Sequence, residues 1–593
     1  MSWKIWVDTG GTFTDCLALD DAGDLSRLKV LSNGTLRGKV ISQLSADQLA
    51  VEINWPVHKD IYKDYVLTDR RDSAIIESVD TSKGLIKLKK ASKYRWVGKT
   101  IELTTNEEVP VFAARLLTST TLGDKFPEIE MKLGSTRGTN AILERKGAKT
   151  ALLITKGFKD LLVIGNQQRP DLFALHVIKE PPLYSIVIEV DEEINTDIIK
   201  KLKRNKIESV AVALINSYKD PAHEQQIKKS LQRAGFKFIS ASQELSKQIR
   251  ILQRTETAVA NAYLAPIIHN YVGYILRSLP NAKLKIMTSA GGLTEASEFH
   301  PKDSLLSGPA GGVVGAATTA KLSGIDKLIT FDMGGTSTDV SLYDGRFDYR
   351  FESKVGSLKI LSPSLAIETI AAGGGSICSF DGFRFTVGPE SAGAYPGPAC
   401  YGAGGPLTIT DVNLLLGRID AKTFTIPLSI EKAGQALNVL IKKVKKKYSR
   451  RDVLLAFVQI ANEKMAGAIR KVSTQSGHDP GDYTLLSFGG AGGQHACALA
   501  SMLGMKNILI PYDAGLLSAY GIGHAKVERF TEKLLLMPLE EAVDHFPDGD
   551  KVLAFVRFKG QDNSIEIDVK GTSDIKEAFR KKYEKIFGHW IDH

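Results

Sequence analysis

Cysteine is scarce in this sequence, which contains four among its 593 residues. The four, at positions 16, 378, 400 and 497, lie far apart and form no C-x-x-C pair. Disulfide frameworks and structural zinc sites need clustered or regularly spaced cysteines, so the spacing supports neither and favours reduced, structural thiols. Long apolar runs are also missing. No stretch approaches the ~18 residues of a membrane-spanning helix, and no apolar leader precedes the first predicted strand. We therefore expect a cytoplasmic protein without membrane contact.

A strong excess of one charge is absent as well. Lys and Arg exceed Asp and Glu by 77 to 67, and the hydrophobic and charged fractions of 43% and 24% are ordinary for a globular protein. Much of the basic excess lies in residues 442–451, which include one aromatic residue and no recognisable nucleic-acid-binding module. We interpret this run as a solvated helix end and expect no nucleic-acid partner.

The length exceeds what one hydrophobic core supports and predicts roughly three or four domains. Residues 3–19 have the pattern of a β-hairpin, whereas residues 36–130 contain short alternating runs separated by polar turns. From 134 to 240, continuous apolar runs alternate with helical segments, which predicts an α/β sheet covered on both faces. The predicted division comprises an N-terminal lobe (1–35 and 131–240), an inserted β-rich small domain (36–130), a central lobe (241–525) and an incomplete C-terminal β/α segment (526–593).

Several further elements are predicted from composition and periodicity. Residues 254–276, interrupted or bent at Pro266, and residues 452–476 have helical patterns. Residues 372–406 are dense in glycine and proline, which predicts a loop, and we expect this loop to border the ligand cleft. Near the end of the chain, the pattern predicts strands within 553–569 and a helix over 574–586.

One eight-residue phrase occurs twice, as Asp8-Thr-Gly-Gly-Thr-Phe-Thr-Asp15 and as Asp332-Met-Gly-Gly-Thr-Ser-Thr-Asp339. Each copy follows a short apolar stretch that predicts a buried strand, so each places an aspartate at a strand end before a Gly-Gly turn. Paired glycines let backbone N–H groups approach phosphate oxygens, and threonine hydroxyls add donors. A single Gly-Gly-Thr fits a hairpin turn equally well, but two copies predict a nucleotide held between two related lobes.

The phrases supply the first set of candidate residues. Asp8 and Asp332 are candidate ligands of Mg²⁺, directly or through water. The candidate nucleotide-binding residues are Gly10, Gly11, Thr12, Thr14, Gly334, Gly335, Thr336 and Thr338.

A third glycine-rich element, Ser487-Phe-Gly-Gly-Ala-Gly-Gly-Gln-His495, lies between a predicted strand and a predicted helix. Alone it fits tight strand-to-helix packing. After two phosphate loops it predicts the adenosine site, because a glycine turn lets a ligand reach the backbone. The candidates are Gly489, Gly490, Gly492 and Gly493. Two other nucleotide motifs fail: Val97-Gly-Lys-Thr100 lacks the upstream glycine of a P-loop, and His495 replaces the last glycine of a Rossmann fingerprint.

Further motifs accompany these loops. In the N-terminal half they are Gly134-Ser-Thr-Arg-Gly-Thr-Asn140, Leu143-Glu-Arg-Lys-Gly147, Thr155-Lys-Gly-Phe158, Arg169-Pro170 and Asp220-Pro-Ala-His-Glu224. In the central part they are Ser307-Gly-Pro-Ala-Gly-Gly312, Gly388-Pro-Glu-Ser-Ala-Gly-Ala-Tyr-Pro-Gly-Pro-Ala-Cys-Tyr401, Thr410-Asp-Val-Asn413 and Leu416-Gly-Arg418. Together with the order of the three loops, they resemble the hydantoinase A/5-oxoprolinase family of the actin-like ATPase superfamily. The resemblance covers about residues 3 to 525, and residues 36–130 depart from it.

This resemblance implies an α/β, two-lobed actin-like (ribonuclease H-like) ATPase fold and an ATP- and Mg²⁺-dependent enzyme. In that family, ATP phosphorylates the enol-like oxygen of a lactam, hydantoin or ketone, and a hydantoinase B-type subunit or fused domain completes hydrolysis or carboxylation. On family frequency we expect 5-oxoproline to be opened to glutamate, by an oligomeric protein. The implied catalytic residues are Asp8 and Asp332, which organise metal and phosphates, and Asp15 and Asp339, which support them or act as bases.

Other candidates keep two interpretations. Thr136, Arg137 and Asn140 reach the substrate or the phosphates, or they form only a turn and a helix cap. Arg169 grips a substrate carboxylate or forms an ordinary surface ion pair.

Alternative functions also stay open. Within the family they are the ATP-binding subunit of an N-methylhydantoinase or of an acetone- or acetophenone-type carboxylase. Outside it they are a non-catalytic actin- or heat-shock-like ATPase and a small-molecule kinase with a stable phosphorylated product. The Gly388 to Tyr401 phrase argues against the non-catalytic ATPase, because actins and heat-shock ATPases do not carry it.

Overall fold

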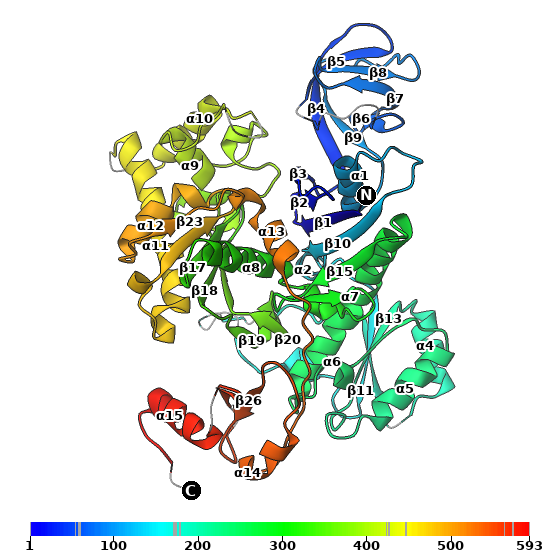
Figure 1. Ribbon diagram of the computed structural model, residues 1–593, viewed down its shortest axis with the longest axis vertical. Helices are drawn as coiled ribbons and strands as arrows, with labels where there is room; N and C mark the ends of the chain where they lie inside the picture. Colours follow the sequence, from blue (N-terminus) through cyan, green and yellow to red (C-terminus); the bar gives the residue numbers. More distant parts are fainter. Residues whose placement is uncertain are drawn as a thin grey trace.

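Two related sheets lie on either side of a central helix pair, α8 (Ser307–Leu322) and α13 (Leu517–His524) (Figure 1). The computed structural model describes residues 2–591 except 54, 57–60, 170–172, 174, 177–178, 192, 423, 425–426, 445–447, 562–563 and 572–573. The mixture of strands and helices around two related sheets confirms the predicted α/β, two-lobed architecture.

The first sheet contains the hairpin predicted over residues 3–19. Its first strands, in the order in which they pair, are β16 (Leu293–Glu295), β15 (Lys283–Met287), β10 (Glu128–Ser135), β1 (Ser2–Thr9), β2 (Phe13–Leu19) and β3 (Leu25–Leu31). Strand β1 is antiparallel to β2 and parallel to β10. Ile5 and Val7 are buried on the face of α1 (Val109–Thr118), and Trp6 is buried on the face of α13. Helices on both faces explain why Ile5, Trp6 and Val7 are all apolar and buried.

Residues 36–130 consist mainly of strands, as the alternating runs predict. The strands are β4 (Thr35–Gln43), β5 (Gln48–Ile53), β6 (Val66–Thr68), β7 (Ser73–Asp80), β8 (Leu85–Leu88) and β9 (Thr100–Thr104). Because β4 pairs with β9 as well as with β5, the strands close into a ring in the order β4-β5-β8-β7-β6-β9. Trp96, Tyr65 and Leu49 fill its interior, and the ring shares one hydrophobic core with the first sheet.

Residues 150–241 form a separate parallel sheet, in agreement with the predicted α/β pattern. Its strands, in order, are β12 (Ile186–Val190), β11 (Thr150–Thr155), β13 (Ser209–Ala213) and β14 (Phe238–Ala241). Leu152 and Ile154 face the long helix α7 (Ile251–Ser278), whereas Ala151 and Leu153 face α4 (Thr196–Arg204) and α5 (Ala222–Arg233) on the other side. Helix α7 contains Pro266 in its interior and confirms the helix predicted over residues 254–276. The helices of this part are α2 (Arg137–Leu143), α3 (Leu161–Ile164), α4 (Thr196–Arg204), α5 (Ala222–Arg233), α6 (Ser242–Leu245) and α7 (Ile251–Ser278).

The second sheet repeats the arrangement of the first. Its strands, in order, are β21 (Ile367–Ile370), β18 (Thr338–Asp344), β17 (Lys327–Met333), β24 (Thr484–Phe488) and β25 (Ile508–Leu509). Strand β17 is antiparallel to β18 and parallel to β24, as β1 is to β2 and β10. The surrounding helices are α9 (Ile409–Leu415), α10 (Ile430–Ile441), α11 (Arg450–Val472) and α12 (Ala496–Met502).

Helix α11 confirms the helix predicted within residues 452–476, and its buried Phe457 and Met465 belong to the core of the second sheet. Residues 445–447 of the basic run lie outside the described residues, so its interpretation as a helix end stays a prediction. The division into domains also stays a prediction. Strands β15 and β16, from the range 241–525, join the first sheet rather than the second.

Residues 372–406 do not form one continuous loop, which corrects the prediction. They contain β22 (Ser376–Phe380) and β23 (Phe385–Ser391), which pair antiparallel. Glycine and proline are concentrated in the flanks, whereas the paired residues carry apolar and β-branched side chains, and Cys378 and Val387 are buried. Glycine and proline in the flanks therefore led to the prediction of a loop. Burial of the side chains between them stabilises the strand pair.

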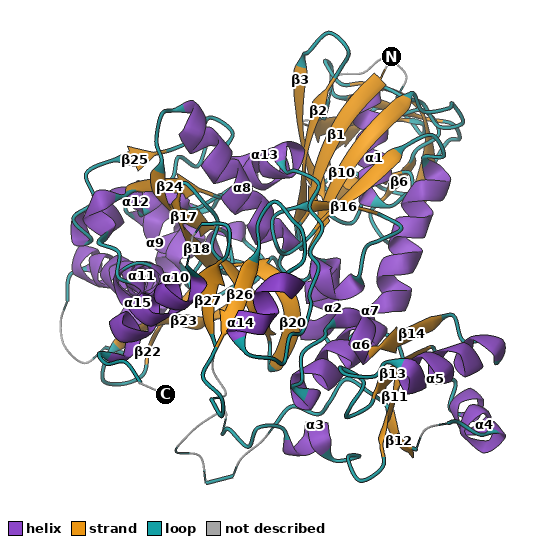
Figure 2. Cartoon of the chain, turned by 60° about the horizontal axis from the view of Figure 1, so that its bottom comes forward, coloured by secondary structure: helices purple, strands orange, loops and turns teal. Residues whose placement is uncertain are grey.

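The residues after 526 form a small β/α unit, as predicted. It contains α14 (Leu539–Ala542), β26 (Leu553–Val556), β27 (Ile565–Asp568) and α15 (Ile575–Phe587), close to the hairpin of β19 (Tyr349–Val355) and β20 (Leu358–Leu365) (Figure 2). The rings of Phe555 and Phe351 join the two at 5.0 Å between centroids. In the part of the chain that the structure describes, no helix has the length and apolarity of a membrane span.

Helices α8 and α13 pack with their backbones in contact. A Cβ atom added to Gly521 would lie 1.9 Å from the carbonyl oxygen of Gly311 and 2.4 Å from the nitrogen of Gly315. A Cβ atom added to Gly315 would lie 2.4 Å from the carbonyl oxygen of Leu517. Only glycine allows this approach, because a Cβ atom at these positions would clash with the backbone of the facing helix. Both helices contact the first sheet, and α8 also contacts the second.

We expect Gly521→Ala to destabilise the protein by about 1–3 kcal/mol, because the added methyl group overpacks the helix contact. The measurement is the thermal unfolding midpoint. Gly467→Ala is the matched control, since Gly467 is exposed in α11 and a Cβ atom there meets nothing within 4 Å. The control should stabilise its helix by roughly 0.5–1 kcal/mol. Equal midpoints for Gly521→Ala and the wild type would show that the close approach is not a constraint.

Candidate functional site

The two copies of the repeated phrase form equivalent hairpins. Asp8 lies directly opposite Asp15 in the pairing of β1 with β2. Asp332 lies opposite Asp339 in the pairing of β17 with β18. Each hairpin therefore places two carboxylates side by side on neighbouring strands, next to its Gly-Gly turn.

The turns of the two hairpins contain equivalent hydrogen bonds. The N–H of Gly10 donates to the carbonyl of Phe13, and the N–H of Gly334 donates to the carbonyl of Ser337, both at 3.1 Å. The residues exposed at the tips, where a ligand can approach the backbone, are Gly11, Thr12, Gly335 and Thr336.

Thr14 and Thr338 are fully buried behind the turns. The hydroxyl of Thr14 lies 3.0 Å from that of Ser32, and the hydroxyl of Thr338 donates to the carbonyl of Ala372 at 2.5 Å. These side chains hold the turns from behind, and their predicted part in nucleotide binding stays a prediction.

The third glycine-rich element lies against the second hairpin. The N–H of Ala491 donates to the carbonyl of Met333 at 2.9 Å. Gly489 has a φ of +78°, and a Cβ atom there would lie 2.3 Å from Oδ1 of Asp332. The turn between β24 and α12 thus requires glycine next to the carboxylate. The structure brings this element and the second phosphate loop together, as the order of motifs predicts.

Residues 373–375, a Gly-Gly-Gly run, form a contact that the motif analysis missed. The N–H groups of Gly374 and Gly375 donate to the carbonyls of Gly334 and Gly335 at 3.0 and 2.6 Å. The triplet therefore lies directly behind the second phosphate loop. The three successive glycines in the sequence could have indicated this contact, because only residues without a side chain fit where two backbone segments pack directly against each other.

Burial raises the pKa values of the four aspartates. Desolvation, followed by the charge of Asp15, raises the pKa of Asp8 to about 7. Desolvation, followed by Asp339, Asp8 and Asp15, raises the pKa of Asp332 to about 8. Burial also raises the pKa of Asp339 to about 6 and that of Asp15 above its usual value. Asp8 and Asp15 of the first hairpin raise the pKa of Asp332 in the second. Both hairpins therefore contribute to one electrostatic site.

Lys29 of β3 supplies a positive charge that the motif analysis missed. Its Nζ lies 2.6 Å from Oδ1 of Asp15 and 3.3 Å from the carbonyl oxygen of Gly515. The corresponding position opposite Asp339 is Thr369, whose hydroxyl donates to that carboxylate at 2.5 Å. The two hairpins therefore differ in charge: the first includes a lysine and the second a neutral hydroxyl. No motif marks Lys29, because its position depends on the register of β2 with β3.

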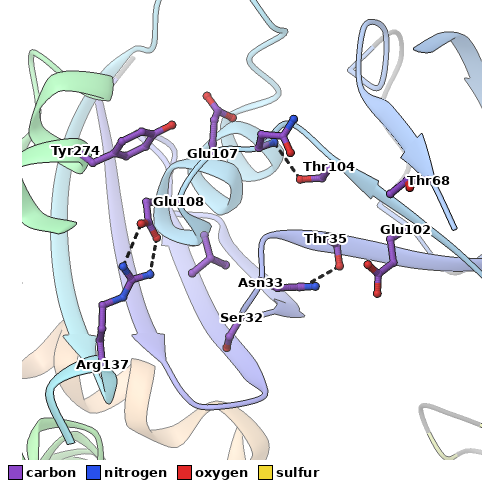
Figure 3. A pocket seen from close by; sticks show the side chains of 12 residues that line it. Ser32, Asn33, Thr35, Thr68, Glu102, Thr104, Glu107, Glu108, Arg137 and Tyr274 are labelled. Atoms are coloured by element: carbon purple, nitrogen blue, oxygen red, sulfur yellow. Dashed lines mark hydrogen bonds and ion pairs between the residues drawn. The ribbon is translucent and has the colours of Figure 1, made fainter. Parts of the chain in front are cut away.

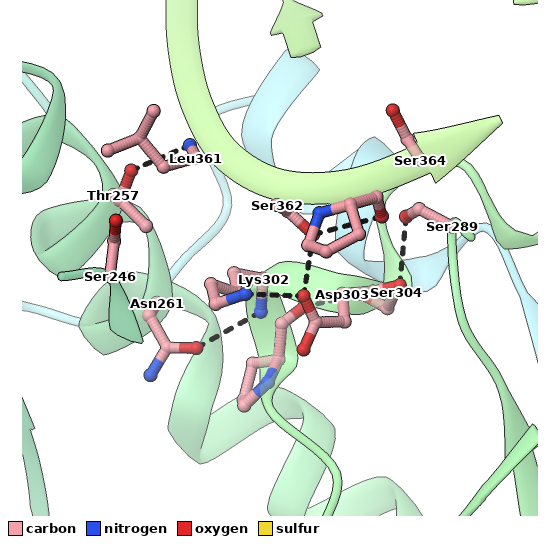
Figure 4. Close-up of polar contacts among 12 residues, drawn as sticks. Ser246, Thr257, Asn261, Ser289, Lys302, Asp303, Ser304, Leu361, Ser362 and Ser364 are labelled. Atoms are coloured by element: carbon pink, nitrogen blue, oxygen red, sulfur yellow. Dashed lines mark hydrogen bonds and ion pairs between the residues drawn. The ribbon is translucent and has the colours of Figure 1, made fainter. Parts of the chain in front are cut away.

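The start of α8 lies against Asp8. A Cβ atom added to Gly308 would lie 3.4 Å from Oδ1 of Asp8. Buried polar contacts hold the segment before the helix (Figure 4): Nζ of Lys302 and the hydroxyl of Ser362 both donate to Oδ1 of Asp303 at 2.5 Å. These contacts tie the segment to β20, so the helix start stays next to the carboxylate.

The carboxylates fit a divalent cation. Oδ1 of Asp8 is buried and has no hydrogen-bond partner among the described residues. A buried carboxylate oxygen without a partner is costly, and a cation would satisfy it. Within the described ranges, no group of three or more His, Cys, Asp and Glu side chains has the arrangement of a metal site. A cation held by Asp8 and Asp332 would take its remaining ligands from water and phosphate, which is the coordination that Mg²⁺ prefers.

Three of the four weaker candidates lie beside the first phosphate loop. The N–H and hydroxyl of Thr136 donate to the carbonyl of Thr9 at 2.9 and 3.1 Å. Arg137 forms a two-point ion pair with Glu108, with bonds of 3.1 and 2.6 Å. The amide nitrogen of Asn140 lies 3.7 Å from the position of a Cβ atom on Gly11.

Arg169, the fourth weaker candidate, is exposed in the segment after α3. Its motif neighbour at position 170 lies outside the described residues. Both interpretations of Arg169 stay open.

Comparison with protein families identifies matches over most of the chain. Residues 254–530 match the family described as Hydantoinase/oxoprolinase, and residues 92–235 match the Hydantoinase/oxoprolinase N-terminal region. "5-oxoprolinase 1" of Arabidopsis thaliana is 36% identical over 82% of this chain and 46% of its own length. "5-oxoprolinase" of Saccharomyces cerevisiae is 39% identical over 67% of this chain and 35% of its own length. An uncharacterized protein of Methanocaldococcus jannaschii is 33% identical over 76% of each chain. The chain spans less than half the length of both 5-oxoprolinases.

Solved structures show the same fold. The ATP-dependent caprolactamase from Pseudomonas jessenii has a TM-score of 0.71 and 24% identity, and the match covers 100% of this chain and 85% of that one. A nucleotide-free acetone carboxylase has a TM-score of 0.65 and 19% identity, and the match covers 98% and 84%. At these identities the likeness concerns the fold, and it confirms the predicted two-lobed α/β class.

The half-buried aspartates, whose pKa values are raised, predict a pH dependence of stability. An unfolded aspartate has a pKa of 3.8, and the folded values for Asp8 and Asp332 are about 7 and about 8. A raised carboxyl pKa contributes stability that is fully present below the unfolded value and is lost as pH rises through the folded value. Without nucleotide and divalent cation, the thermal unfolding midpoint should therefore fall as pH rises through this window. In Asp332→Asn the unfolding midpoint should decrease less with pH than in the wild type. In Asp344→Asn, a control on β18, it should decrease as in the wild type. Identical pH profiles for wild type and Asp332→Asn would contradict the assignment.

Proposed function

Because the chain belongs to the hydantoinase/oxoprolinase family, we propose that it is the ATP-binding part of an enzyme that opens cyclic amides. 5-Oxoproline, opened to glutamate, is the first substrate to test. Two relatives that carry the name 5-oxoprolinase are 36% and 39% identical to this chain. The observation that carries this proposal is the pair of equivalent hairpins whose carboxylates share one electrostatic site.

Amide oxygens are weak nucleophiles, so the first task is to align one with the γ-phosphate of ATP and to exclude water. The amide oxygen attacks the γ-phosphorus, the bond to the leaving ADP oxygen breaks, and the amide proton passes to a base. A first water then adds to the activated carbon and the ring C–N bond breaks, which leaves an amine and an acyl phosphate. A second water releases inorganic phosphate from the acyl phosphate.

The residues of this chain serve the phosphoryl-transfer half of that sequence. The turn tips at Gly11, Thr12, Gly335 and Thr336 present backbone N–H groups and hydroxyls to phosphate oxygens. Gly489 to Gly493 accept the adenosine, next to the second hairpin. Asp15 and Asp339 are the candidate bases or supports for Asp8 and Asp332. Bound Mg²⁺ would neutralise phosphate charge.

A hydantoinase B-type partner, as a subunit or a fused domain, completes the hydrolysis in this proposal. Its support is the family assignment together with length: the chain covers 46% and 35% of the two 5-oxoprolinases. A relative named "Caprolactamase subunit alpha" is 32% identical over 72% of this chain, which is consistent with a separate second subunit.

We expect ATP hydrolysis by this chain, mixed with a B-type partner and Mg²⁺, to rise when 5-oxoproline is added. The measurement is phosphate release together with glutamate formation. ATP turnover that ignores 5-oxoproline would redirect the search to hydantoins, other lactams and ketones. A released phosphorylated product in place of inorganic phosphate would indicate a small-molecule kinase instead.

We expect Asp332→Asn to lower the rate of substrate-stimulated ATP turnover by about 100-fold or more, because it removes a preorganised charge at the transferring phosphoryl group. Asp344→Asn, further along the neighbouring strand, should retain the wild-type rate. Full turnover by Asp332→Asn would exclude a mechanism that uses both phosphate loops.

A further inference from the structure

Helix α9, which contains the Thr410-Asp-Val-Asn413 motif, contacts three glycine-rich segments beside the second sheet. The segments are residues 373–375, the end of the 388–401 phrase and the third glycine-rich element at 487–495. Three side chains of the motif each bond to a different one of these segments. The motif therefore joins parts of the site that lie far apart in the sequence.

Thr410 bonds to the glycine triplet behind the second phosphate loop. Its N–H and its hydroxyl both donate to the carbonyl of Gly374, at 2.7 and 2.9 Å. The N–H of Gly374 in turn donates to the carbonyl of Gly334 at 3.0 Å. A Cβ atom added to Gly374 would lie 2.8 Å from the hydroxyl of Thr410 and 3.7 Å from Cβ of Ala491. Thr410 thus connects to the second phosphate loop through one residue, at a point where the third element also packs.

Asn413 bonds to the third element. This side chain is fully buried, and its amide nitrogen lies 3.0 Å from Oε1 of Gln494 and 3.1 Å from Nε2 of His495. The other ring nitrogen of His495 lies 2.7 Å from Oδ1 of Asn462 in α11. Burial lowers the pKa of His495 to about 4, so the ring is neutral and its Nε2 accepts from Asn413. The end of the third element is therefore held by both α9 and α11.

Asp411, between these two residues, bonds to the end of the 388–401 phrase. Its fully buried carboxylate accepts from the N–H groups of Ala399 and Cys400 at 3.1 and 2.7 Å. The same carboxylate accepts from the N–H and the hydroxyl of Thr408 at 2.8 and 2.9 Å, which caps the helix. A shift of α9 relative to any of the three segments would break buried hydrogen bonds, which is costly.

Other residues of the same segments are open to a ligand. Gly335, Gly490 and Gly493 are exposed, and a Cβ atom added to any of them would meet nothing within 4 Å. The backbone is therefore accessible at both the second phosphate loop and the third element, while α9 connects the two.

The first phosphate loop has a different neighbour, a pocket where the ring of β4 to β9 joins the first sheet (Figure 3). Ser32 lines this pocket, and its hydroxyl donates to the carbonyl of Gly10 at 2.8 Å. Its N–H donates to the carbonyl of Thr12 at 3.0 Å. The first loop therefore borders open space, whereas the second loop packs against the backbone of the glycine triplet.

Resting on the proposed function, we propose that Thr410 and Asn413 are positioning residues for the nucleotide. Through them, α9 holds the second phosphate loop and the third element at a fixed separation. Neither side chain contacts the nucleotide in this proposal; they set the distance between the part that binds phosphate and the part that binds adenosine. Nucleotide affinity depends on this distance, because a preorganised site loses less conformational entropy on binding.

The test is calorimetric binding of ADP with Mg²⁺ to the full chain of 593 residues. Thr410→Val removes one hydroxyl at a partly exposed position and keeps the N–H bond, and we expect the Kd to rise about 3- to 10-fold, the loss of one hydrogen bond. Asn413→Leu removes the donor to both Gln494 and His495 and should raise the Kd about 10- to 100-fold. The double variant should raise it by less than the product of the two effects, because either loss already releases one segment from the other.

Two controls separate positioning from a general loss of structure. Thr410→Ser keeps the hydroxyl and should bind ADP as the wild type does. Thr318→Val is the matched control, because the hydroxyl of Thr318 also donates to a backbone carbonyl, that of Val314 at 2.8 Å within α8; it should leave the Kd unchanged. In the turnover assay with a B-type partner, Thr410→Val should raise the KM for ATP and leave the KM for 5-oxoproline unchanged.

Hydrogen exchange measures the connection through α9 without nucleotide. Asn413→Leu alters contacts of the third element, yet it should also speed exchange at the amides of Gly374 and Gly375, which donate to the second phosphate loop. Unchanged exchange there would contradict the inference. If the wild type binds ADP and both variants bind it equally well, the inference is wrong and the proposed function stands. If exchange speeds up at both segments but the wild type binds no ADP, the connection through α9 stands and the proposed function fails.

Discussion

The structure depends on the forced proximity of like-charged carboxylates. Hairpin register places Asp8 beside Asp15 and Asp332 beside Asp339, and burial raises the pKa of each toward neutrality or above its usual value. Four such groups are stable together only when protons, a lysine or a cation compensate their charge. Lys29 supplies part of that compensation, and the unpartnered oxygen of Asp8 provides a place for a cation. The site therefore needs further positive charge, which a divalent cation would supply.

Glycine makes this proximity possible at each point where backbones meet. Gly521 allows α13 to touch α8, and Gly489 allows the glycine-rich loop after β24 to approach Asp332. A side chain at any of these points would separate elements that have to be in contact. The glycine residues therefore let the elements around the two hairpins pack closely.

The two lobes are related in backbone but differ in what surrounds the hairpins. The second hairpin lies against the glycine-rich loops around 374 and 489. The first lies against Lys29 and the pocket at the base of the strand ring. Arg27 of β3 also bonds through two atoms to Asp513, at 2.6 and 2.9 Å, just before α13. The two equivalent hairpins therefore have chemically different surroundings.

The sequence by itself determined the elements whose signals are local. Apolar runs and Gly-Gly turns predicted the first hairpin and the strand before the second turn, helical periodicity predicted α7 and α11, and alternation predicted the strands of 36–130. The same local signals misjudged residues 372–406, where glycine and proline in the flanks concealed β22 and β23. For the site, the repeated phrase predicted that Asp8 and Asp332 lie at strand ends before Gly-Gly turns, whereas their pairing with Asp15 and Asp339 came only from the structure.

Only the tertiary structure decided which distant groups meet. Closure of the ring depends on β4 pairing with β9, the position of Lys29 depends on the register of β3, and the pair of Arg137 with Glu108 joins α2 to the end of the ring. Backbone conformation and polarity are set by neighbours along the chain, and short patterns reveal them. Contacts between remote strands depend on the packing of the whole core, and no single stretch of sequence encodes them.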